Sequence, residues 1–186
     1  MAAAEPPPGR RSERAMALPD GRTVRVRPIR HDDAPRLVQA FERLSDESRY
    51  RRFLSPTDHL TTGMVEYLTS VDHLVHEALV ALDESGAIVG VARFIRSQDE
   101  PWTAEVAVTV VDDWQSDGVG TVLMEQLIHR ARELDIARLT GDVLSENLKM
   151  HQLLRDFGPL QIINREAGVE SFSLPIGDTD AADGAA

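Results

Sequence analysis

Apolar side chains alternate with polar ones, or run uninterrupted, in seven short stretches of the chain, a pattern that predicts β-strands. The predicted strands are Thr23–Ile29, His76–Leu82, Ala87–Ile95, Trp102–Val111, Arg138–Val143, Leu160–Ile163 and Gly168–Leu174. The turn Asp83–Gly86 joins the second and third strands and indicates an antiparallel hairpin. Pro28 cannot donate a ladder hydrogen bond, so we expect the first strand to lie near a sheet edge.

Five other segments carry apolar residues every three or four positions, which predicts helices. These helices begin near His31, Ser48, Thr61 or Thr62, Thr121 and Glu146. Ser145 is expected to cap the last of them, which ends at Phe157. The helix that ends at Leu134 has an apolar stripe that must pack on a sheet: Val119, Leu123, Leu127, Ala131 and Leu134.

This order of elements predicts a single α/β domain with one mixed sheet of about seven strands and helices on both faces. The sheet is expected to be mostly antiparallel, with a locally parallel centre, because two helices each connect neighbouring strands. We assign residues 18–176 to the domain. Residues 1–17 and 177–186 are expected to be flexible tails, because they are rich in proline, alanine and polar residues without apolar periodicity.

The composition of the chain argues against several classes of function. The 20 basic and 31 acidic side chains give a net charge of −11, which argues against nonspecific binding to nucleic acid and favours a cationic partner. The sequence has no cysteine, which excludes disulfides, thiolate metal sites and cysteine nucleophiles. The 6 histidines show no metal-ligand spacing, so we expect no metal. Without an apolar run of about 18 residues we expect no membrane contact and a cytoplasmic protein.

The segment Gln115–Gly120 lies between the apolar strand Trp102–Val111 and a predicted helix. A glycine-containing turn at the start of a helix presents backbone N–H groups to an anion, which suits a phosphate-bearing cofactor. Short glycine motifs also occur in ordinary chain reversals, so the loop by itself leaves both interpretations open.

The order of elements, the Gln-x-x-Gly-x-Gly loop after the third strand of a meander, and Asn147 after the next strand together resemble the GNAT superfamily of acyl-CoA N-acyltransferases. The resemblance covers about Thr23–Leu174. The stretch Leu44–Phe53 is similar to the corresponding segment of bacterial GNAT domains that acetylate protein lysines. Tyr50, Phe53 and the neighbouring arginines would then line an acceptor cleft, or form an ordinary core edge with a solvated basic face.

The resemblance implies that acetyl-CoA is a cosubstrate, held with its diphosphate against the backbone of Gln115, Ser116, Asp117, Gly118, Val119, Gly120 and Thr121. The pantetheine arm would pair with Val108, Thr109 and Val110, which requires their strand to separate from the parallel strand Arg138–Val143. Asn147 would contact the same arm, or would satisfy a backbone group in the first turn of its helix. Asp117 departs from the family pattern, which often has a basic residue in this loop.

Acyl transfer to an amine requires a base, because an alkylammonium group titrates near 10.4. Glu105 is the only charged residue between Trp102 and Val111 and matches a glutamate that family members carry on this strand. Apolar neighbours would raise its pKa and make it a better base, whereas the same alternation fits a solvent-facing glutamate. Many relatives protonate the leaving thiolate with a tyrosine, and the corresponding residue here is Leu154.

The expected function is transfer of an acetyl group from acetyl-CoA to a primary amine, which could be a protein lysine. Two alternatives stay open at this point. One is acylation of a small amine, and the other is a noncatalytic acyl-CoA-binding module, which the missing tyrosine and the acidic loop both permit.

Overall fold

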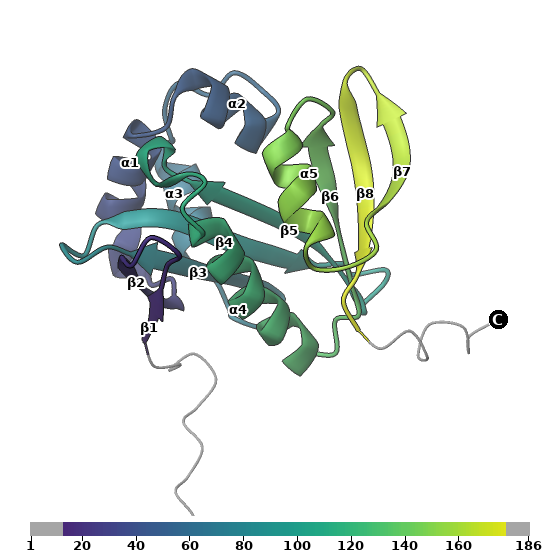
Figure 1. The fold of residues 1–186 in the computed structure, drawn as a ribbon, viewed down its shortest axis with the longest axis horizontal. Helices are drawn as coiled ribbons and strands as arrows, with labels where there is room; N and C mark the ends of the chain where they lie inside the picture. Colours follow the sequence, from purple (N-terminus) through teal and green to yellow (C-terminus); the bar gives the residue numbers. More distant parts are fainter. Residues whose placement is uncertain (1–12, 178–186) are drawn as a thin grey trace, which may run out of the picture.

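A computed structural model describes residues 13–177 as one domain built on a mixed sheet of eight strands in the order β1-β2-β3-β4-β5-β6-β8-β7 (Figure 1). The strands are β1 (Arg14–Ala17), β2 (Thr23–Pro28), β3 (His76–Leu82), β4 (Ile88–Arg96), β5 (Thr103–Val110), β6 (Arg138–Leu144), β7 (Gln161–Glu166) and β8 (Val169–Pro175). The helices are α1 (Ala34–Glu42), α2 (Asp46–Phe53), α3 (Thr62–Thr69), α4 (Val119–Glu133) and α5 (Leu148–Arg155), with short 3-10 turns η1 (His31–Asp33) and η2 (Asp112–Trp114). All seven predicted strands and all five predicted helices are present in this part of the chain.

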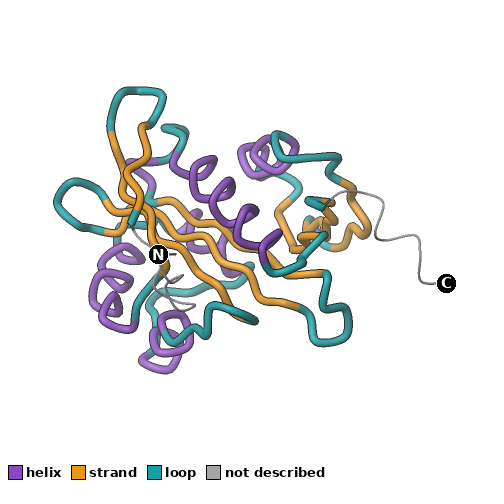
Figure 2. Tube along the Cα trace, turned by 90° about the horizontal axis from the view of Figure 1, so that it is seen from below, coloured by secondary structure: helices purple, strands orange, loops and turns teal. Residues whose placement is uncertain are grey.

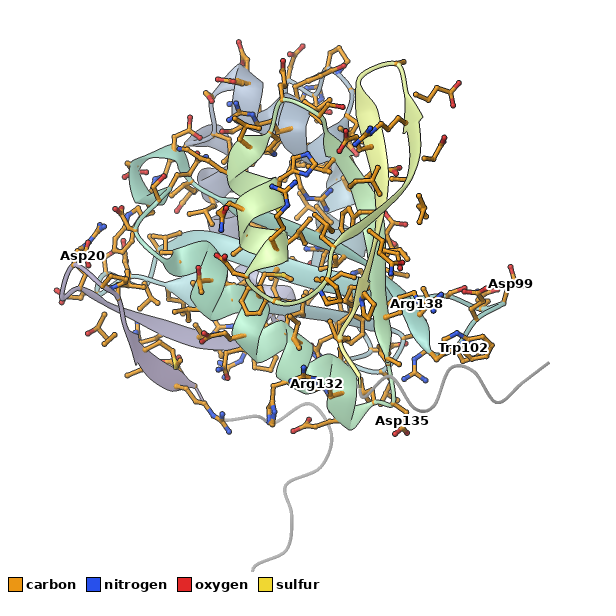
Figure 3. All side chains as sticks on the ribbon, turned by 45° about the vertical axis from the view of Figure 1, so that its right-hand side comes forward. Asp20, Asp99, Trp102, Arg132, Asp135 and Arg138 are labelled. Carbon is orange, nitrogen blue, oxygen red and sulfur yellow. The ribbon has the colours of Figure 1, made fainter. Side chains whose placement is uncertain are left out.

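Strands β1 to β5 form an antiparallel meander, and β6, β8 and β7 form a second antiparallel group. The two groups join through one parallel pair, β5 and β6. At the start of this pair the N–H of Arg138 donates to the carbonyl of Trp102 over 3.1 Å, and the two labelled side chains lie near each other in Figure 3. The ladder then runs only from Thr103 to Glu105, after which the two strands separate, as Figure 1 shows.

Helices cover both faces of the sheet (Figure 2). The long helix α4 packs on β3, β4 and β5, where its side chains Leu123 and Leu127 are fully buried. Gly90 on β4 permits this packing, because a Cβ atom there would lie 2.9 Å from Cδ1 of Leu123. Helix α1 packs on β4 through Leu37 and Phe41, which are also buried. The apolar stripe predicted for α4 therefore faces the sheet.

A buried ion pair fastens α4 to the sheet. Nε of Arg130 donates to Oε2 of Glu77 over 2.9 Å, and a second guanidinium nitrogen donates to the carbonyl of His73 over 2.7 Å. Burial raises the pKa of Glu77, but hydrogen bonds from His73 and Arg130 and their charges outweigh it, so the net shift is downward. The ion pair therefore fixes the C-terminal end of α4 on the sheet.

One expectation for the N-terminal region is wrong. Arg14–Ala17 is a strand, so the predicted tail of residues 1–17 is too long; residues 1–12 and 178–186 lie outside the described part of the chain. Because β1 pairs with β2 in the register Arg14↔Val26, β2 is the second strand from the sheet edge, near an edge as expected. Pro28 is tolerated because it is the last residue of β2.

Between residues 13 and 177, no helix is both long and apolar enough to cross a lipid bilayer.

Candidate active site

A groove of about 700 Å³ opens where β5 and β6 separate. Its walls include most of the residues expected at the cofactor site: Val108, Thr109, Val110, Gln115, Ser116, Gly118, Gly120, Thr121 and Asn147. Strand β5 pairs with β4 as far as Val110, but its pairing with β6 ends at Glu105. One edge of β5 is therefore free to hydrogen-bond an extended ligand in the groove, as a further strand would.

The loop between β5 and α4 presents its backbone N–H groups at one end of the groove. Ser116 and Gly118 have left-handed backbone conformations, with φ of 68° and 93°. Within residues 13–177, the amides of residues 116–121 donate no hydrogen bond to another protein group. Free amides at the N-terminus of a 15-residue helix favour an anion through both hydrogen bonding and the helix dipole.

The side chain of Gln115 fixes the shape of this loop. Its amide nitrogen donates to the carbonyl of Val110 over 3.2 Å, to the hydroxyl of Ser48 over 3.0 Å and to Oδ1 of Asp112 over 3.2 Å. These contacts tie the loop to the end of β5 and to α2. Gln115 is therefore a positioning residue for the amides that follow it.

Asp117 and Val119, two of the expected cofactor residues, do not face the groove with their side chains. The Asp117 carboxylate forms an ion pair with Arg22 over 2.6 Å, and the Val119 side chain is 1% exposed and belongs to the core. Only the backbone N–H groups of these two residues can serve an anion. The acidic side chain is directed to Arg22, which removes the charge conflict that the sequence suggested.

Glycine suits the two loop positions, 118 and 120, for different structural reasons. Gly118 has a positive φ, and a Cβ atom there would lie 2.8 Å from Cδ of Pro19, so glycine is required by the turn itself. Gly120 lies in the first turn of α4, where a Cβ atom would be in contact with Leu153 at 3.4 Å. Gly120 lines the groove, so a long side chain at this position would enter it.

Asn147 caps α5, with Oδ1 accepting a hydrogen bond from the N–H of Met150 over 3.2 Å. Ser145, which we expected to be the cap, lies before the helix, which begins at Leu148. The local alternative for Asn147 is thus observed, and the residue also lines the groove. Its carboxamide nitrogen is the part that could serve a ligand.

Three cationic side chains line the groove, Arg51 and Arg52 from α2 and Lys149 from α5. Lys149 is the only lysine in the sequence. The sequence left the arginine-rich helix open as an acceptor wall or as a core edge with a solvated basic face, whereas it contributes Arg51 and Arg52 to the same groove as the loop amides. The local pattern cannot show this, because α2 reaches the groove only through the packing of distant segments.

Glu105 stands at the point where β5 and β6 separate, as the last residue of β5 that pairs with β6. Its side chain is exposed, so the solvent-facing alternative is observed and the apolar enclosure is absent. The apolar neighbours Ala104 and Val106 are buried because they point to the opposite face of the strand. Glu105 is outside the wall of the groove. Its negative charge acts on Arg52, whose pKa is nevertheless lowered, because the effect of burial is larger than that of the Glu105 charge.

Leu154, expected at the place of the family's tyrosine, is buried in the core with 1% exposure. Its neighbour Leu153 lines the groove instead. The family's tyrosine is therefore replaced by a leucine, whether Leu153 or Leu154 is taken as the corresponding residue. Within the described chain, no cluster of three or more histidine and carboxylate side chains has the arrangement of a metal site.

Comparisons with known proteins agree with this geometry. The sequence profile of the acetyltransferase (GNAT) family matches residues 36–158. Over 138 residues, or 74% of its length, the chain is 33% identical to acetyltransferase Pat of Mycolicibacterium smegmatis, of which it spans 41%. Over 128 residues, or 67% of its length, it is 38% identical to acetyltransferase PA5475 of Pseudomonas aeruginosa, of which it spans 65%. The crystal structure of the GNAT domain of S. lividans PAT superimposes with a TM-score of 0.82 and 35% identity, covering 88% of this chain and 96% of that domain.

Proposed function

The chain belongs to the acetyltransferase (GNAT) family, and on this premise we propose that it transfers an acetyl group from acetyl-CoA to a primary amine. The observation that supports the proposal best is the separation of β5 from β6 after Glu105, directly beside the free amides of residues 116–121. Together they provide a free strand edge and an anion site in one groove.

The chemistry of the groove fits the proposed cosubstrate. A diphosphate needs N–H donors and cations, which the loop amides, Arg51 and Lys149 provide. The pantetheine arm contains amide groups that can pair with the free edge of β5 at Val108, Thr109 and Val110. In this arrangement the thioester lies toward Glu105 and the phosphates toward α4.

In the proposed reaction the neutral amine attacks the thioester carbonyl carbon, a C–N bond forms, the C–S bond breaks and CoA leaves as a thiolate. We assign Glu105 as the general base that removes the proton from the amine. Because the Glu105 side chain is exposed and outside the groove wall, we expect it to act through one bound water. A backbone N–H of the 108–110 segment stabilises the charge that develops on the carbonyl oxygen.

The leaving thiolate has no tyrosine of α5 to protonate it, because Leu154 stands at the family's tyrosine position and no tyrosine of the described chain lines the groove. A thiolate with a pKa near 8.5 leaves without general acid catalysis and takes its proton from water. The absence of the tyrosine therefore does not favour the noncatalytic alternative over an enzyme.

For the acceptor we favour a lysine of another protein. The net charge of −11 attracts a cationic acceptor, and the segment Leu44–Phe53 resembles that of protein-lysine acetyltransferases. The chain spans less than half of one curated relative, so this assignment concerns the domain.

An acceptor screen tests the proposal. The protein is incubated with labelled acetyl-CoA and a panel of small amines and lysine-bearing proteins, while CoA release and labelled products are measured. Labelled protein lysine is the expected product. Turnover with free amines alone would establish the small-amine enzyme, and binding of acetyl-CoA without any turnover would establish the noncatalytic module.

A further inference from the structure

A second, smaller cavity lies next to the groove, between the sheet and helices α1 to α3. Its volume is about 50 Å³, whereas one buried water needs about 10–15 Å³, so it holds a group of a few heavy atoms. Arg52 and Thr109 line both this cavity and the groove, so the two adjoin each other at these residues. Apart from Arg52, Arg93 and Thr109, its walls are apolar side chains and Gly90.

Arg93 brings a buried positive charge to this cavity. The residue is 5% exposed and projects from β4. Its guanidinium donates to Nε2 of His76 over 3.1 Å and to the carbonyl of Leu68 over 3.2 Å, both neutral acceptors. Among residues 13–177, no carboxylate lies within ion-pair distance of it. Burial and the nearby charge of Arg52 lower the pKa of Arg93 to about 9.

Arg52 is the second cation of this cavity, and the charge of Glu105 acts on it only from beyond ion-pair distance. Its guanidinium lies over the ring of Phe53, 4.9 Å from the centroid, and the described chain offers it no ion pair. The neighbouring arginines of α2 differ in this respect, because Arg51 pairs with Glu47 and Arg49 with Asp46. The wall of this cavity therefore carries two arginines that have no ion-pair partner among the described residues.

We propose that Arg52 and Arg93 bind a carboxylate carried by one of the two substrates. Buried cations are normally compensated by an anion, and a guanidinium is the side chain best suited to a carboxylate. The inference rests on the proposed function, since the cavity adjoins the acyl-CoA groove. The carboxylate belongs either to the acyl group, as in a dicarboxylic acyl-CoA, or to the amine acceptor.

The acyl source is tested by calorimetric titration with succinyl-CoA and butyryl-CoA, which both carry four-carbon acyl groups and differ at the end of the chain. If the acyl group supplies the carboxylate, succinyl-CoA binds about ten- to 100-fold more tightly than butyryl-CoA. The Arg52→Gln substitution brings this ratio close to one. Any effect of Arg52 on the binding of the phosphates cancels in the ratio of the two Kd values, because both ligands carry the same CoA moiety.

The acceptor source is tested with acetyl-CoA and two lysine peptides that differ only in a glutamate or a glutamine beside the lysine. If the acceptor supplies the carboxylate, the wild type has a higher kcat/KM for the glutamate peptide, and Arg52→Gln removes the preference. Arg25→Gln is the charge-matched control, because Arg25 lies on β2 away from the cavity and should leave both ratios unchanged.

The absence of a carboxylate preference in both tests would overturn the inference, as would a preference that survives Arg52→Gln. In either case the binding and turnover of acetyl-CoA itself would still support the proposed function. If acetyl-CoA neither binds nor reacts, the proposed function fails and the inference fails with it.

Discussion

Arg22 and Asp117 form an ion pair over 2.6 Å between the turn after β1 and the loop before α4. The Arg22 guanidinium also lies 4.1 Å from the ring centroid of Trp114, which keeps it above the loop. The ion pair draws the only carboxylate of the Gln115–Gly120 segment away from the groove, so a loop with an acidic residue can still receive a diphosphate.

Replacement of Arg22 by alanine should therefore weaken acetyl-CoA binding. We expect a rise in Kd of about two- to fivefold, because the pair is exposed and its effect is screened by water. Asp117→Asn in the Arg22→Ala background should restore the affinity, and high salt should reduce the difference. Calorimetric titration measures the Kd of Arg22→Ala, the Kd of the double variant and the effect of salt on the difference. An unchanged Kd in Arg22→Ala, or no recovery in the double variant, would contradict this role of the pair.

His76 should make stability depend on pH. Its pKa is lowered from 6.5 to about 4, first by burial and then by the charge of Arg93, which donates to its ring. Between these two pH values the unfolded chain binds a proton that the folded protein does not, so the free energy of unfolding falls as the pH falls. Urea unfolding across this interval should show a smaller pH dependence in His76→Gln than in the wild type.

An NMR titration of the His76 ring gives an independent check, because the folded protein should keep the ring neutral down to about pH 4. A ring that titrates near 6.5 in the folded protein would contradict this prediction.

Glu105→Gln should lower kcat by about 10²-fold or more, because the amine loses its general base. The affinity for acetyl-CoA should stay the same, since Glu105 is outside the groove wall. Glu125→Gln, an exposed position on α4, is the matched control and should behave like the wild type. The pH–rate profile is the decisive readout, and a profile that does not change in Glu105→Gln would remove this residue from the mechanism.

Periodicity was sufficient to predict the main elements of the fold. The stripe Val119, Leu123, Leu127 predicts the buried face of α4, because only one face of that helix can pack on a sheet. Strand β1 escaped prediction, because the four residues Arg14–Ala17 are too few to show a pattern and are ordered by backbone pairing with β2.

The candidate site was less predictable than the fold, because its contacts join distant segments. The loop glycines were recognisable, but the Arg22 partner of Asp117 and the position of Arg51 in the groove depend on tertiary packing. The strand alternation allows either an enclosed or a solvent-facing Glu105, and the side chain is exposed because its apolar neighbours point to the opposite face.

Titration of acetyl-CoA into the wild type and into Gly120→Glu tests the account most directly. Gly120 lines the groove without a positive φ, so glutamate there should place a long acidic side chain in the groove while α4 still forms. We expect one acetyl-CoA to bind the wild type, Gly120→Ala to bind comparably, and Gly120→Glu to bind about 100-fold more weakly or not at all. A wild type that does not bind acetyl-CoA, or a folded Gly120→Glu variant that binds it as well as the wild type, would contradict the assignment of the groove.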